Sequence, residues 1–150
     1  MRRSIAFMAL VVFSAAFHCS VAFAHCEVPC GIYDDVLRVK LIAEHADTIE
    51  KSMKQIETLR KESPVNFNQL VRWISNKEEH ASQLQHIVSQ YFMTQRIKPD
   101  QEKYLEKLAV LHKILLAAMK CKQTTELSHV NALRALLKEF EVLYFGHSVQ

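Results

Sequence analysis

Apolar residues recur at spacings of three and four along four stretches of the chain, a pattern that places them on one face of an α-helix. The first stripe comprises Ile42, Ala46, Ile49, Met53, Ile56 and Leu59, and the second Phe67, Leu70, Trp73, Ile74, Ala81, Leu84, Ile87, Val88 and Tyr91. The third comprises Tyr104, Leu105, Leu108, Leu111, Leu115 and Met119, and the fourth Leu127, Val130, Leu133, Leu137, Phe140 and Leu143. Four such helices with short connections predict an all-α fold, an antiparallel four-helix bundle over residues 34–150.

Polar residues and prolines mark the expected helix ends. The acidic pair Asp34–Asp35 lies where the start of a helix favours negative charge, and Ser63–Pro64 is expected to end the first helix. Pro99 closes the second helix, and Asp100 is expected to cap the third. The polar segment Lys122–Thr125 separates the third helix from the fourth.

Composition agrees with a helical domain and excludes several other classes. The 150 residues are 49% hydrophobic and include only 2 Gly and 3 Pro, too few for the turns of a many-stranded sheet and too apolar for a disordered chain. The net charge of +3 depends partly on two arginines near the N-terminus, and residues 25–150 are close to neutral. A near-neutral body lacks the basic face that phosphate contacts need, so no nucleic-acid partner is expected.

The first 24 residues are typical of a secretory signal. Arg2–Arg3 forms a positive start, Ile5–Phe17 an apolar run, and Ala22–Phe23–Ala24 a small-residue cleavage site. An uncleaved membrane anchor is the alternative, but the polar interruption at residues 18–20 leaves the apolar run short for a span. We therefore expect a cleaved leader, no membrane attachment afterwards, and a periplasmic or secreted mature protein.

Cleavage after Ala24 would make His25 the first residue and give it a free α-amine. Cys26 and Cys30 follow, and Pro29 and Gly31 can bend the chain so that two thiolates meet at one ion. An α-amine, a deprotonated backbone amide of Cys26 and two thiolates form a planar set of two nitrogens and two sulfurs. Such a set suits Ni(II) or Cu(II) better than tetrahedral Zn(II), and the His25 imidazole could add an axial ligand.

The segment 25–33 resembles the nickel hook of nickel-containing superoxide dismutases. The residues that carry the resemblance are His25, Cys26, Pro29, Cys30, Gly31 and Tyr33. It implies a four-helix bundle that assembles as a homohexamer, with one nickel ion per subunit held by His25, Cys26 and Cys30. It also implies disproportionation of superoxide to dioxygen and hydrogen peroxide by a Ni(II)/Ni(III) couple. His25 and Tyr33 would then be the catalytic residues, with Tyr33 beside the metal, positioning superoxide or water and helping to deliver protons.

Three other interpretations of these residues stay open at this point. Cys26 and Cys30 could form a disulfide in an exported protein, or could exchange thiols, although no thioredoxin-like strand pattern surrounds them. The chain could also be an exported bundle that binds nickel or copper without catalysis.

The remaining histidines are scattered, and each is expected to be a surface or packed residue; they are His45, His80, His86, His112, His129 and His147. Cys121 is expected to be a buried, inert thiol.

Overall fold

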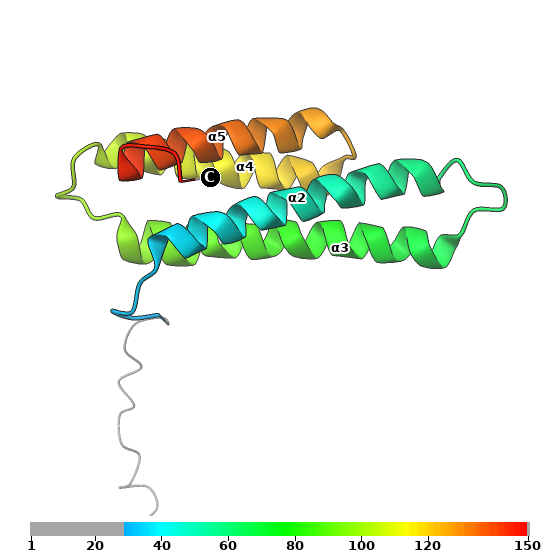
Figure 1. The fold of residues 1–150 in the computed structure, drawn as a ribbon, viewed down its shortest axis with the longest axis horizontal. Coiled ribbons are helices and arrows are strands. Elements are labelled where there is room, and N and C mark those ends of the chain that lie inside the picture. Colours follow the sequence, from blue (N-terminus) through cyan, green and yellow to red (C-terminus); the bar gives the residue numbers. More distant parts are fainter. Residues whose placement is uncertain (1–28, 150) are drawn as a thin grey trace, which may run out of the picture.

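The computed structural model describes residues 29–149. The helices are α2 (Asp35–Leu59), α3 (Phe67–His86), α4 (Tyr104–Gln123) and α5 (Leu127–Phe145), and the π-helix η1 (Ile87–Arg96) continues α3 directly. Helix α2 packs against α3 and α5, and α4 packs against the same two helices (Figure 1). The predicted all-α, antiparallel four-helix bundle is confirmed for the described residues.

Side chains cap two of the helices at their N-termini. Asp34 Oδ1 accepts a hydrogen bond from the Leu37 backbone N–H at 2.9 Å, so the acidic pair does begin α2. Asn66 accepts one from the Gln69 backbone in the same way at the start of α3. The prediction that Asp100 caps the third helix is wrong. The residue before α4 is Lys103, in the left-handed conformation, and Asp100 lies in the preceding turn.

The core contains most of the predicted stripes. Every residue of the first stripe is buried, and so are the later members of the second and the central members of the fourth. In the third stripe only Leu111 is buried, because α4 turns a neighbouring set of residues to the core: Val110, Ile114, Ala118 and Cys121. Five stripe residues are exposed instead: Phe67, Ile74, Leu105, Met119 and Leu127. The α2–α3 hairpin extends beyond the end of the α4–α5 hairpin, which leaves Phe67, at the start of α3, with little to pack against (Figure 1). A stripe spaced by three and four residues is therefore wider than the face that the neighbouring helices cover.

A buried lysine of α3 donates hydrogen bonds to the C-terminal end of α4. Lys77 is 3% exposed, and its Nζ donates to the carbonyl oxygens of Cys121 (2.7 Å) and Lys122 and pairs with Glu78 at 3.0 Å. These carbonyls belong to the last turn of a helix, where backbone acceptors lack partners and carry partial negative charge.

None of the described helices is both long enough and apolar enough to span a membrane.

The last part of the second predicted helix is not α-helical. From Ile87 to Arg96 the backbone forms a π-helix, and the Ile97 N–H donates to the Phe92 carbonyl, five residues back, at 2.9 Å. Tyr91 and Arg96 are also five residues apart, so one π turn brings them to the same side of the helix. The start of α2, the end of η1 and the end of α5 lie at one end of the bundle (Figure 1).

Candidate metal centre

The described part of the predicted hook is a tight turn. The Ile32 N–H donates to the Pro29 carbonyl at 2.8 Å, and Gly31 has a φ of 79°, a conformation that residues with a Cβ rarely adopt. Cys30 is an exposed residue of this turn and is disulfide-bonded in the structure. The predicted ligands His25 and Cys26 lie outside the described residues. The chain therefore reverses direction at the one predicted thiolate ligand that the structure describes.

Tyr33 follows the turn and packs between two side chains of η1. The guanidinium carbon of Arg96 lies 4.2 Å from the centre of the Tyr33 ring, a cation–π contact. The Tyr91 ring meets the Tyr33 ring edge-on, with 5.8 Å between ring centres. Both contacts use the ring of Tyr33, and its hydroxyl makes no hydrogen bond to any residue in 29–149. Tyr33 is 38% exposed, so these contacts leave part of the residue accessible.

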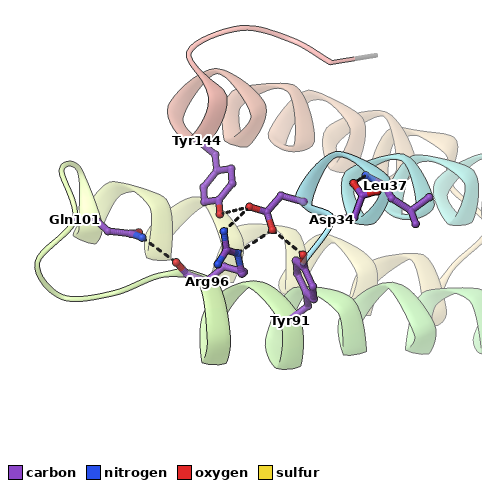
Figure 2. Close-up of polar contacts among 7 residues, drawn as sticks. Asp34, Leu37, Tyr91, Arg96, Gln101 and Tyr144 are labelled. Atoms are coloured by element: carbon purple, nitrogen blue, oxygen red, sulfur yellow. Dashed lines mark hydrogen bonds and ion pairs between the residues drawn. The ribbon is translucent and has the colours of Figure 1, made fainter. Parts of the chain in front are cut away.

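Asp35, the first residue of α2, anchors this arrangement. Its carboxylate accepts hydrogen bonds from the Tyr91 hydroxyl (2.6 Å), from Arg96 Nε and Nη2 (2.8 Å each) and from the Tyr144 hydroxyl (2.8 Å). Figure 2 shows Tyr91, Arg96 and Tyr144 converging on one carboxylate from η1 and α5. We call Asp35, Tyr91, Arg96 and Tyr144 the Asp35 cluster. It joins α2, η1 and α5 to one another.

The Asp35 cluster keeps fixed protonation states near neutral pH. Burial alone would raise the pKa of Asp35, but hydrogen bonds from Arg96, Tyr91 and Tyr144 outweigh it and lower that pKa below its usual value. Burial and the bond to Asp35 raise the pKa of Tyr144 to about 12 and raise the pKa of Tyr91 further. The cluster thus holds one anion, one cation and two neutral phenols. It can position groups rigidly, but it is poorly suited to exchanging protons itself.

Comparison with known protein families identifies the family of the chain. The model of the family described as nickel-containing superoxide dismutase matches residues 20–148. The chain belongs to the nickel-containing superoxide dismutase family. Its activity is the dismutation of superoxide, and its cofactor is nickel. No curated protein and no solved structure matches the chain in the corresponding comparisons.

In this nickel-containing superoxide dismutase, residues 29–149 contain no second cluster suited to a metal. They include no group of three or more His, Cys, Asp or Glu side chains that could hold an ion. Two histidines expected to stand apart do meet, because α2 and α3 run side by side. The Nδ1 atoms of His45 and His80 are 2.9 Å apart. Burial, together with the nearby His80, lowers the pKa of His45 and so favours its neutral form.

Sequence reasoning missed the Asp35 cluster. Asp35 was expected only as an acid at a helix start, and Tyr91 only as a member of an apolar stripe. A tyrosine at a core position was the available signal, since a buried hydroxyl usually needs a hydrogen-bond partner. Arg96 carried no signal, because the π-helix that brings it beside Tyr91 does not follow the spacing of an α-helix.

Cys121 is buried as predicted, and burial raises its pKa to about 11.

Proposed function

We propose that this superoxide dismutase binds one nickel ion per chain at the hook formed by residues 25–33. The ligands would be the α-amine and imidazole of His25, the backbone nitrogen of Cys26 and the thiolates of Cys26 and Cys30. Two nitrogens and two thiolates in a plane suit Ni(II), and anionic donors make its oxidation easier. The family requires a nickel site, and residues 29–149 offer no other group of metal-binding side chains.

The observation that carries this proposal is the turn that starts at Pro29. Cys26 and Cys30 are separated by three residues, so both thiolates can reach one ion only if the chain curls back near Cys30. The hydrogen bond from Ile32 to Pro29 and the positive φ of Gly31 provide such a reversal. Because nickel binds thiolates, the disulfide at Cys30 must be reduced before the metal enters.

The reaction converts two superoxide anions and two protons into dioxygen and hydrogen peroxide. When bound, nickel supplies the one-electron chemistry by cycling between Ni(II) and Ni(III). The chain supplies position and protons. We assign proton delivery to the Tyr33 hydroxyl and nearby water, because Arg96 and Tyr91 hold the ring of Tyr33 while the residue stays partly exposed.

We also propose that the leader, residues 1–24, is removed during export and that the mature protein acts in the periplasm or outside the cell. Export fits the apolar run and the small-residue site before His25.

We further propose that the chains assemble as a homohexamer. Three apolar side chains around the turn are exposed in the single chain, namely Ile32 (83%), Val36 (38%) and Leu37 (48%), and contact with further copies would cover them. Sedimentation of the nickel-loaded protein measures the number of chains.

The experiment that tests the nickel site is the addition of one residue before His25. A mature chain that begins at His25 is compared with a chain that begins with Gly followed by His25. The extra residue converts the α-amine into an amide, so we expect it to remove nickel and activity together. Nickel per chain and the rate of superoxide decay are measured on both proteins. Equal nickel content and equal rates would refute the proposed ligand set.

A further inference from the structure

A small cleft lies beside the hook turn and opens between α2 and the α3–η1 helix. It has a volume of about 50 Å³, and its lining includes Pro29, Arg38, His86, Tyr91 and Gln95. A water molecule needs roughly 10–15 Å³ of such space, so the cleft has room for a group of two or three heavy atoms but not for a metabolite. Pro29 directly precedes the proposed ligand Cys30. The cleft therefore adjoins the proposed metal site.

Arg38 is the cation of this cleft, and no carboxylate of residues 29–149 forms an ion pair with it. Among residues 29–149, Arg60, Arg96 and Arg134 each form an ion pair, whereas Arg38 forms none. Its Nε atom is buried and has no hydrogen-bond partner. Asp34 and Asp35 are nearby carboxylates in the sequence, but Asp34 accepts the Leu37 N–H as the cap of α2. The hydrogen bonds of Asp35 go to Arg96, Tyr91 and Tyr144. A half-buried guanidinium with an unused donor is a costly arrangement unless an anion or water satisfies it.

Tyr91 connects this cation to the candidate catalytic tyrosine. The Arg38 guanidinium carbon lies 5.1 Å from the centre of the Tyr91 ring, and the edge of that ring meets Tyr33. Gln95 is buried in the cleft wall; its Nε2 donates to the Gln90 carbonyl, while its Oε1 is buried without a partner. Oε1 would accept a hydrogen bond from a water molecule held with the anion. The cleft thus combines a free cation, a place for water and contact with Tyr33.

We propose that this cleft is a binding site for a small monovalent inorganic anion and that Arg38 draws superoxide through it toward the hook. The role in catalysis rests on the proposed nickel site, whereas anion binding does not. Arg38 has a free N–H donor and a positive charge, the two features that an anion of this size needs for recognition. A cation beside a cleft also raises the local concentration of an anionic substrate and its rate of capture, and salt weakens that effect.

The catalytic part is tested with Arg38→Met on the nickel-loaded protein. Met keeps an apolar stem that can pack on Tyr91, and Lys40→Met removes one charge from an exposed position of the same helix as a matched control. We expect kcat/KM at low ionic strength to fall roughly threefold to tenfold in Arg38→Met and to depend less on salt. Lys40→Met should stay near the wild type, Arg38→Lys should recover part of the loss, and nickel content should be unchanged throughout. Equal losses in the two Met variants, or none in Arg38→Met, would overturn the proposal.

The binding part is tested on the nickel-free protein with azide, a linear monovalent anion of three atoms. In a nitrogen-15 NMR titration, the Arg38 Nε–H signal should shift saturably, and the ring signals of Tyr91 should shift with it. In Arg38→Met, the Tyr91 signals should not move. Absence of a saturable shift of the Arg38 Nε–H signal in the wild type would refute the proposed anion site. A shift in a protein whose hook then fails to bind nickel would refute the proposed function and leave the anion site standing.

Discussion

The carboxylate of Asp35 accepts two parallel hydrogen bonds from Arg96, one from Nε and one from Nη2, each at 2.8 Å. These residues are 61 positions apart, and their pairing ties the start of α2 to the end of η1. The same Arg96 guanidinium covers the ring of Tyr33, two residues before Asp35. One ion pair therefore connects the segment that follows the hook with the rigid bundle. Such paired, planar geometry is the strongest form of side-chain hydrogen bonding in proteins.

Asp35→Asn tests how much this connection stabilises the fold. Asn keeps the size of the side chain but loses the charge that Arg96, Tyr91 and Tyr144 share. Hydrogen bonds to a charged group contribute more than neutral ones, so the free energy of unfolding should fall by about 2 kcal/mol. Urea denaturation measures it. The matched control is Asp47→Asn, because Asp47 pairs with Arg134 but its side chain is 73% exposed, and the expected loss there is below about 1 kcal/mol. Equal losses would show that Asp35 contributes no more than a surface acid.

The ionised Asp35 carboxylate should make the free energy of unfolding depend on pH in the acidic range. Its pKa in the folded protein lies below its unfolded value, so the folded state binds fewer protons in acid and the contribution of Asp35 is complete above the unfolded pKa. That contribution should be lost as the pH falls below about 4, the range of an unfolded aspartate. Unfolding free energies measured between about pH 6 and pH 2 should fall less steeply in Asp35→Asn. Parallel curves for the two proteins would contradict the assignment.

Tyr33→Phe separates the ring of Tyr33 from its hydroxyl. The contacts with Arg96 and Tyr91 involve the ring, so Phe should keep the packing, and nickel content should equal that of the wild type. Loss of the hydroxyl should change the saturation or inhibition of superoxide decay, which stopped-flow or pulse radiolysis records. Tyr33→Ala, which also removes the ring, is the comparison and should disturb the hook more. Loss of nickel in Tyr33→Phe would show that the hydroxyl has a structural role instead.

Replacing Cys30 with Ala should remove nickel from the protein, whereas replacing Cys121 with Ala should leave the nickel content unchanged. Cys30→Ala should abolish nickel retention and activity, because it removes a proposed thiolate ligand. Cys121→Ala is the control. Burial raises the pKa of Cys121 to about 11, so it stays a neutral thiol inside the core, and its loss should cost some stability but no nickel. Metal analysis of both purified variants gives the answer. Full nickel content in Cys30→Ala would exclude it from the site.

The fold was predictable because its helices follow the spacing of an ideal α-helix. The first stripe, from Ile42 to Leu59, is buried throughout, and Asp34 caps α2 where the acidic pair suggested a start. The prediction failed where backbone geometry departs from that spacing. The π-helix changes which residues of 87–96 share a face, and Lys103 precedes α4 in a left-handed conformation that its residue type does not suggest.

The candidate site was predictable only in its local part. The hook motif is a short, continuous run of residues, so candidate ligands could be proposed from the sequence alone, and they stay a prediction. The Asp35 cluster and the cleft of Arg38 join residues from separate helices, and no spacing along the chain predicts which of them meet. That Arg38 forms no ion pair within residues 29–149 is likewise a property of the packed structure, because Asp34 caps α2 and Asp35 binds Arg96.

Intact mass spectrometry of the native protein under non-denaturing conditions tests the nickel hook most directly, since it reads the N-terminus and the bound metal together. The account predicts a chain that begins at His25 and carries one nickel ion. A chain that retains residues before His25, or one that begins there with no nickel and a Cys26–Cys30 disulfide, would contradict it.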